Sequence, residues 1–190
     1  MRRITMLVVC TLALAVCVGS AAAQEPADTL KIDYYSGAGS TPDGTLRITN
    51  PGTAGGGLCA SIFVFDSYQE LQACCSCYIS PDGLITLSVN ADLLGNTLTG
   101  VEPVTGAIKI VSSALKAPLT CPYYPSSLTP TAGLRAWATH IQTGGVITET
   151  ASQDATLSAA EVKRLQAECF GIQLDGSGKG QCYCPYEGTL

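Results

Sequence analysis

The sequence predicts a mostly β protein: a disulfide-bridged antiparallel β-sandwich with one C-terminal α-helix. Short alternating or apolar stretches recur between turn residues, eight cysteines follow an export signal, and one capped helical pattern lies near the C-terminus. No solenoid-length repeat and no domain boundary interrupts residues 24–190. We therefore expect these residues to form a single domain.

The first 23 residues have the plan of a secretory signal peptide. Arg2 and Arg3 precede an apolar run from Leu7 to Val18, and small residues follow up to Ala23. The run is too short for a membrane-spanning helix. We expect residues 1–23 to be removed and residues 24–190 to be secreted, into the periplasm or the extracellular space, with no integral membrane segment.

Composition narrows the range of partners. Only 13% of the residues are charged, and the loss of Arg2 and Arg3 leaves eight basic residues against fifteen acidic ones, a net charge of −7. An acidic surface repels nucleic acid and anionic membranes. The sequence therefore predicts no nucleic-acid partner, and solubility is the simplest role for the negative charge.

Eight cysteines remain after signal removal, an even number that predicts structural disulfides in an exported chain. Two cysteines that are adjacent or one residue apart in an extended stretch form a disulfide poorly. Their Cα atoms lie about 3.8 Å apart when the residues are adjacent and about 6.6 Å apart when one residue separates them, and neither distance suits a bridge. If such local bridges are excluded, every remaining pairing joins Cys182 or Cys184 to the Cys74–Cys77 cluster. The eight are Cys59, Cys74, Cys75, Cys77, Cys121, Cys169, Cys182 and Cys184.

The alternative for these cysteines is a metal site. Thiolates of the Cys74–Cys77 cluster and of Cys182 and Cys184 are suitable ligands for zinc or copper. No histidine lies near either group, and oxidising export conditions favour bridges. We therefore predict structural disulfides, with no metal and no cofactor.

The expected strands are short and separated by Gly, Pro, Asn and Asp. In residues 70–78, period two places Leu71, Ala73, Cys75 and Cys77 on one side and Cys74 on the other, which fits a two-layer arrangement bridged in more than one direction. Residues 117–131 carry four prolines and Cys121 and are expected to form a bridged surface loop. The strands are expected at residues 30–35, 45–49, 58–65, 70–78, 84–89, 107–112, 134–142 and 146–150.

One helix is well marked. Ser158 and Glu161 form a capping box, with Leu157 and Val162 placed as a hydrophobic staple. Val162, Leu165 and Cys169 share a face, and Gly171 is a suitable end for the helix. Cys169 is thus expected to attach the helix to the sheet.

Catalytic patterns are sparse. His140 is the single histidine, no Gly-x-Ser-x-Gly motif occurs, and the ring is expected to be structural. Residues 175–180 are expected to form a turn instead of a phosphate loop. Carboxylates such as Asp66 and Glu70 are scattered, and a glycosidase needs two at a set separation. Six tyrosines can either stack on a sugar or pack: Tyr34, Tyr35, Tyr68, Tyr78, Tyr123 and Tyr124.

Four stretches resemble a group of exported, cysteine-rich bacterial proteins to which no function is assigned. The Gln-Ala-Cys-Cys-x-Cys run is the most distinctive part. The resemblance implies a full-length member of a secreted single-domain family and transfers no catalytic or binding residue. The stretches are Leu46–Thr53 (LRITNPGT), Ser61–Cys77 (SIFVFDSYQELQACCSC), Leu87–Gly100 (LSVNADLLGNTLTG) and Thr156–Cys169 (TLSAAEVKRLQAEC).

These observations favour a non-enzymatic exported protein, either a cell-surface or matrix structural component or an adhesion-like ligand-binding module. A surface glycan is one possible partner, and self-assembly through an open sheet edge is another. Two alternatives stay open. One is a polysaccharide hydrolase of unfamiliar type using carboxylates such as Asp66 and Glu70, and the other is a metal-binding exported protein using the cysteine cluster.

Overall fold

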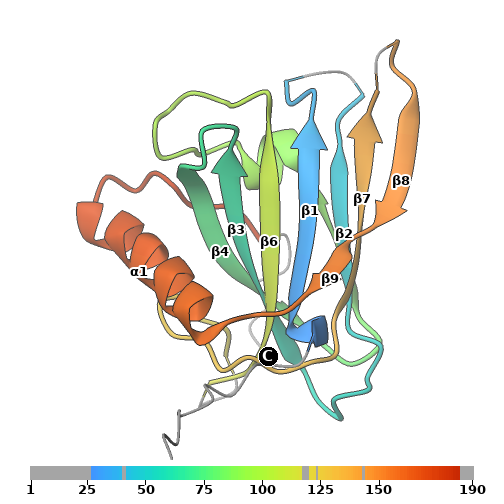
Figure 1. Ribbon diagram of the computed structural model, residues 1–190, viewed down its shortest axis with the longest axis vertical. Coiled ribbons are helices and arrows are strands. Elements are labelled where there is room, and N and C mark those ends of the chain that lie inside the picture. The colour runs from blue at the N-terminus through green and yellow to red at the C-terminus, as the bar shows by residue number, and fades with distance from the viewer. Residues whose placement is uncertain (1–26, 40–41, 117–119, 123, 143, 185–190) are drawn as a thin grey trace, which may run out of the picture.

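A computed structural model describes residues 27–39, 42–116, 120–122, 124–142 and 144–184. It confirms a mostly β fold of two antiparallel sheets with one C-terminal helix and four disulfides (Figure 1). The predicted signal peptide lies outside the described residues. The strands are β1 (Leu30–Ser36), β2 (Thr45–Thr49), β3 (Leu58–Asp66), β4 (Leu71–Ile79), β5 (Leu84–Ser88), β6 (Thr105–Ala114), β7 (Arg135–Ile141), β8 (Ile147–Ala151) and β9 (Gln153–Ala155). The helices are the short 3₁₀-helix η1 (Ala27–Thr29), the short π-helix η2 (Val89–Leu93) and the α-helix α1 (Ala159–Asp175).

The strands form a five-stranded sheet in the order β4-β3-β6-β1-β9 and a four-stranded sheet in the order β5-β2-β7-β8. Apolar residues of the two inner faces, such as Leu46, Ile48 and Ile62, are completely buried between them. Alternation along β2 produces this directly, because Leu46 and Ile48 share a face and the residues between them point outward. The sandwich predicted from the strand patterns is therefore confirmed.

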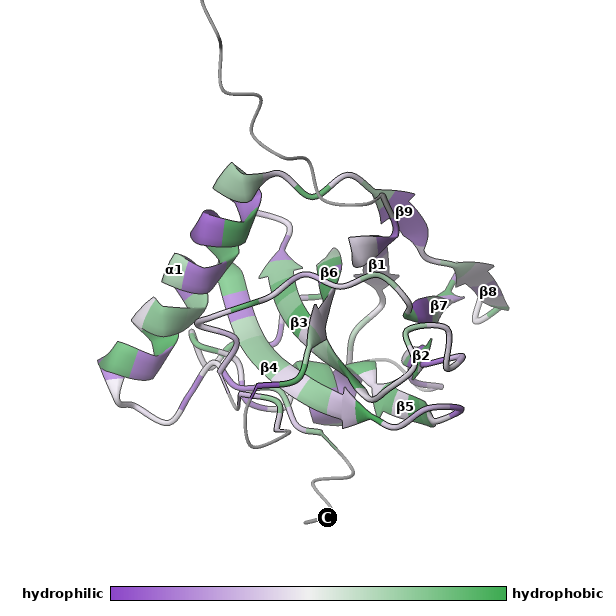
Figure 2. Cartoon of the chain, turned by 90° about the horizontal axis from the view of Figure 1, so that it is seen from below, coloured by the Kyte–Doolittle hydropathy of each residue, from purple (hydrophilic) through white to green (hydrophobic). Residues whose placement is uncertain are grey.

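Helix α1 forms a third layer on the outer face of the five-stranded sheet (Figure 1). Leu165, Cys169 and Ile172 are its buried stripe, and they pack with Phe63 and other residues of β3, β4 and β6 in a second core. Figure 2 shows the resulting alternation of apolar and polar positions along the helix. The predicted cap is present, since Ser158 Oγ accepts the Glu161 N–H at 3.1 Å.

Two sequence predictions need correction. The helix continues past Gly171 to Asp175 and ends at Gly176, which takes the left-handed conformation at φ 67°. Ile172 extends the buried stripe by one residue, and its packing stabilises the helix beyond Gly171. Leu71 lies on the helix side with Cys74, because a β-bulge between β3 and β4 reverses the alternation at Gln72.

Both lateral openings of the sandwich are closed. On one side β8 and β9 form a strap: β8 pairs with β7 of the four-stranded sheet and β9 pairs with β1 of the five-stranded sheet. On the other side the C-terminal tail, residues 180–184, runs along β4, where Cys74 N–H donates to Gly180 O at 2.9 Å. The tail also buries Cys182 and Cys184 in the core between the sheets.

Candidate functional site

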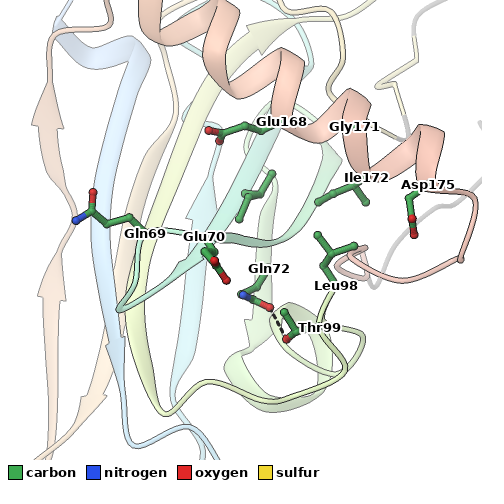
Figure 3. A pocket seen from close by; sticks show the side chains of 10 residues that line it. Gln69, Glu70, Gln72, Leu98, Thr99, Glu168, Gly171, Ile172 and Asp175 are labelled. Atoms are coloured by element: carbon green, nitrogen blue, oxygen red, sulfur yellow. Dashed lines mark hydrogen bonds between the residues drawn. The ribbon is translucent and has the colours of Figure 1, made fainter.

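A groove lies between α1 and the edge of β4. Its volume is about 580 Å³, and we call it the α1–β4 groove. Ile172 of α1 and Leu98 face each other across one end, with Glu70 and the Gln72–Thr99 hydrogen bond on the β4 side (Figure 3). Its lining residues are Gln69, Glu70, Leu71, Gln72, Leu98, Thr99, Glu168, Gly171, Ile172 and Asp175.

A second hollow of about 470 Å³ adjoins this groove at Gln72 and Thr99, which line both. We call it the Tyr68 hollow, because the Tyr68 side chain is 85% exposed and forms part of its wall. Its other lining residues are Asp66, Ser67 and the segment 101–105. We call the two hollows together the concave surface, since they share Gln72 and Thr99 as lining residues.

The β3–β4 hairpin turn positions the Tyr68 side chain. Asp66 Oδ1 accepts the N–H groups of Tyr68 and Glu70, each at 2.9 Å, which fixes the turn from within. Gln69 takes the left-handed conformation at φ 70°, as the last residue of a three-residue hairpin loop does. Tyr68 therefore stands at the tip of a rigid turn with its ring in solvent.

Gln72 forms the partition between the two hollows. It is buried at the bulge, its Nε2 donates to Asp66 Oδ2 at 2.9 Å, and its Oε1 accepts the Thr99 hydroxyl at 2.9 Å. The amide is thus satisfied within the protein, and its orientation is fixed by both partners. The bulge that displaces Leu71 also places this amide between the hollows.

The electrostatic character of the α1–β4 groove is acidic. Glu70, Glu168 and Asp175 line it, together with the amide of Gln69. Glu168 Oε1 accepts from Arg164 Nη1 at 2.7 Å, while its buried Oε2 has no hydrogen-bond partner among the described residues. The carboxylates that the groove offers to solvent are therefore those of Glu70 and Asp175.

Arg164 belongs to a charged cluster that holds the start of α1 to the sheet. Glu161 Oε1 accepts from Lys109 Nζ of β6 at 2.6 Å and from Arg164 Nη2 at 2.8 Å. The hydrogen bond from Arg164, reinforced by Lys109, lowers the pKa of Glu161 to about 2. Both cations also lie over the Phe65 ring, at 5.4 Å for Lys109 Nζ and 5.3 Å for Arg164 Cζ.

All eight cysteines that were predicted to form disulfides are paired. Cys75 joins Cys182 and Cys77 joins Cys184, which confirms the predicted link between the tail and the Cys74–Cys77 cluster. Cys74 joins Cys169, which confirms that α1 is attached to the sheet on the opposite face of β4. The remaining bridge, Cys59–Cys121, anchors the proline-rich loop.

The closest approach to a metal-ligand cluster among the described residues is Cys75, Cys77 and Cys184. Their sulfurs lie within 4.8 Å of one another. Each sulfur is half of a disulfide, and a disulfide sulfur is not a thiolate ligand. The cluster is therefore two neighbouring bridges in the core.

The predicted carboxylates and tyrosines separate into different roles. Asp66 and Glu70 both lie near the concave surface, but both oxygens of Asp66 accept hydrogen bonds from the hairpin. Tyr35 is buried, donates to Phe65 O at 3.1 Å, and has its pKa raised by burial. Tyr34 stacks on His140, and Tyr123 lies outside the described residues.

His140 lies fully buried in β7 where the strap crosses. Its Nε2 is 2.9 Å from Thr150 Oγ1 and 3.5 Å from Asp33 Oδ1, and the Tyr34 ring stacks on it with centroids 3.9 Å apart. Hydroxyl and carboxylate contact the same nitrogen, so the set lacks the two-nitrogen relay of a catalytic triad. None of these residues lines the α1–β4 groove or the Tyr68 hollow.

Sequence patterns indicated only some of the groove residues. Gln72, Leu98, Thr99, Glu168 and Asp175 come from three separate segments, and no local spacing relates them. The expected strands at residues 58–65 and 70–78 left a short turn between them, but the sequence did not indicate that the Tyr68 ring is exposed.

Comparison of the chain with family models, with curated proteins and with solved structures finds no match. Within the described part of the chain, no helix is long and apolar enough to cross a membrane.

Proposed function

We propose that the protein is an exported, non-enzymatic binding module of the cell surface or matrix that takes a neutral polysaccharide on the surface formed by the α1–β4 groove and the Tyr68 hollow. The signal-like residues 1–23 and four disulfides support export, because bridges persist in oxidising compartments. The resemblance to exported bacterial proteins points to the same location.

The exposed Tyr68 ring is the observation that carries this proposal. An aromatic side chain held at 85% exposure by a rigid turn offers a flat apolar face beside a hollow. Stacking on such a ring suits the apolar face of a pyranose. Because the backbone of the turn is already ordered, binding has to immobilise only the side chain.

Hydrogen-bonding groups around the groove support a hydroxyl-rich ligand. The carboxylates of Glu70 and Asp175, both exposed, line it. Carboxylates accept hydrogen bonds from sugar hydroxyls, and they repel polymers that carry carboxylate or sulfate groups. A neutral chain therefore fits this surface better than an anionic one.

The hydrolase alternative has weaker support. An acid–base pair needs carboxyl groups free to exchange protons with a substrate. Both oxygens of Asp66 are committed to Tyr68, Glu70 and Gln72, which makes this carboxylate part of the hairpin. The metal-binding alternative also lacks a ligand set, since the cysteine sulfurs are bridged.

Titration calorimetry with cellohexaose, xylohexaose and laminarihexaose tests the proposal, with polygalacturonate as the anionic comparison. We expect at least one neutral oligosaccharide to bind and polygalacturonate not to bind. Tyr68→Ala removes the stacking surface and is expected to weaken binding about tenfold, the equivalent of about 1.4 kcal/mol.

Tyr183→Ala is the matched control, since its ring is also exposed, at 63%, and lines neither hollow. It should bind the oligosaccharides as the native protein does. Equal weakening by both variants, or no binding of any neutral oligosaccharide, would contradict the proposal. Release of reducing ends during incubation would favour the hydrolase instead.

A further inference from the structure

The four-stranded sheet ends in two exposed strands of equal length. β5 (Leu84–Ser88) forms one edge and β8 (Ile147–Ala151) forms the other, and each has five residues. β5 carries no charged residue and no proline, which are the usual devices that keep an edge from pairing. Edges of this kind accept another strand.

The backbone groups of β5 that face outward can be assigned from the ladder. Asn50 N–H donates to Gly83 O and Val89 N–H donates to Gly44 O, at the two ends of the β2–β5 pair. Bonded and non-bonded pairs alternate in an antiparallel ladder, so Ile85 and Leu87 bond to β2. The N–H and C=O groups of Leu84 and Thr86 therefore point away from the sheet.

The same reasoning applies to β8. Gln142 N–H donates to Val146 O and Ser152 N–H donates to Ala136 O, at the ends of the β7–β8 pair. By alternation, the outward backbone groups belong to residues 147, 149 and 151. Both edges thus present unpaired groups at every second residue, with the repeat that strand pairing requires.

Strand direction makes the two edges complementary. Every neighbouring pair in the sheet is antiparallel, and the number of strands is four. β5 and β8 consequently run in opposite directions. A second copy in the same orientation, moved across by the width of the sheet, places its β8 antiparallel to β5 of the first.

We propose that the protein assembles head to tail with copies of itself, β8 of one copy adding to β5 of the next. The interface is heterologous, and every added copy leaves one β5 edge and one β8 edge free, so the addition repeats into an open filament, which sheet twist makes helical. Each junction continues the antiparallel order of the four-stranded sheet.

Side chains on the outer face support the same pairing. Leu84 is 58% exposed and Ile147 is 53% exposed, which leaves an apolar residue on each edge. The single charge on β8, Glu149, is already paired with Arg47 of β2 at 2.5 Å. No charge on β5 opposes it, so the added strand meets no like-charge repulsion.

The five-stranded sheet is not suited to this addition. Its β4 edge is occupied, since Cys74 N–H donates to Gly180 O and Gln72 O accepts the Leu98 N–H at 2.8 Å. Its other edge, β9, has only three residues and is itself part of the strap. Growth through the four-stranded sheet leaves the groove beside α1 free.

Sedimentation velocity and negative-stain electron microscopy test the assembly, using protein purified from the exported fraction over micromolar to millimolar concentrations. Native protein is expected to form oligomers that grow with concentration into filaments. Leu84→Lys blocks the β5 edge and Ile147→Lys blocks the β8 edge, because a lysine on an edge strand opposes pairing. Each variant alone is expected to remain monomeric.

A mixture of the two variants identifies the interface. The Leu84→Lys chain retains β8 and the Ile147→Lys chain retains β5, so the mixture should form dimers and nothing longer. Leu174→Lys is the matched control, since Leu174 on α1 is 69% exposed, and this variant should assemble like the native chain. Circular dichroism melting confirms that each variant is folded.

A native chain that stays monomeric at every concentration would overturn the proposal. Self-association of either blocked variant would indicate a symmetric pairing of like edges and would also overturn it. So would loss of assembly in Leu174→Lys, which would place the interface on the helix.

Discussion

At the residue scale, His140 shows how a buried polar ring is accommodated in a β-sandwich. Its Nε2 has a hydroxyl partner in Thr150 and Tyr34 covers one face, while Nδ1 has no hydrogen-bond partner among the residues described. The sequence indicated a structural histidine from the absence of nucleophile motifs. It did not indicate the partners, because β1 and β8 contribute them from about 100 residues before and 10 residues after the ring.

Thr150→Val tests the Thr150–His140 hydrogen bond. Valine keeps the shape and strand preference of threonine but leaves a buried imidazole nitrogen without its closest partner. We expect unfolding free energy to fall by about 1 kcal/mol, measured by urea denaturation at neutral pH. Thr148→Val is the control, because its hydroxyl bonds Gln142 on the exposed surface, and its effect should stay within about 0.5 kcal/mol. An equal loss of unfolding free energy in both variants would mean that the buried hydrogen bond contributes no more to stability than the exposed one.

At the scale of elements, local sequence patterns predicted which strands and helix form better than they predicted where each element ends. The eight expected strands are present, because alternation and turn residues act within one segment. The wrong end at Gly171 and the wrong face for Leu71 both arise from tertiary contacts, namely Ile172 packing on the second core and the bulge opposite β3. The short helix η2 and the strand β9 were not predicted. The three residues of β9 are too few to show a detectable alternation.

The attachment of α1 to the sheet depends in part on charge. The pKa of Glu161 falls from its ordinary value of 4.5 to about 2 because the ionised form accepts from Arg164 and Lys109. A lowered folded-state pKa contributes stability that is present above pH 4.5 and is lost as pH falls toward 2. Glu161→Gln should therefore lower the unfolding free energy at pH 7 by about 1 kcal/mol, a value reduced by solvent screening.

The difference between Glu161→Gln and the native protein should shrink as pH is lowered from 5 to about 2, and urea denaturation across this range measures it. Glu102→Gln serves as the control, because no hydrogen bond or ion pair of Glu102 is found within the described structure. A difference in unfolding free energy that stays constant with pH would show that Glu161 acts through its size or the helix cap.

At the scale of the whole molecule, the sandwich depends on closures that the cysteine spacing predicted only in part. Exclusion of local bridges placed Cys182 or Cys184 on the Cys74–Cys77 cluster, and both are there. The spacing did not show that the tail fills the opening between β4 and the four-stranded sheet. The groove was also beyond prediction, because its walls come from three segments that meet only after the helix docks.

The two tail bridges are expected to be strongly non-additive. Cys75–Cys182 and Cys77–Cys184 each span 107 residues, but Cys74–Cys169 already fixes the chain on β4. The first tail bridge then closes a loop of only about 15 residues, worth about 3 kcal/mol in the chain-entropy model, and the second closes a still smaller one worth roughly 2 kcal/mol. Either bridge alone therefore holds the tail.

Replacing one pair by alanine should lower the unfolding free energy by about 2 kcal/mol, and replacing both pairs by about 5 kcal/mol. Guanidinium denaturation of the four proteins of this double-mutant cycle measures the coupling. Removal of both bridges should also raise amide exchange at Cys74, whose N–H donates to Gly180 O, while the strap strands β8 and β9 keep native exchange. Equal, additive losses from the two bridges would show that each holds a different part of the structure, and faster exchange in the strap would show that the two closures of the sandwich are coupled.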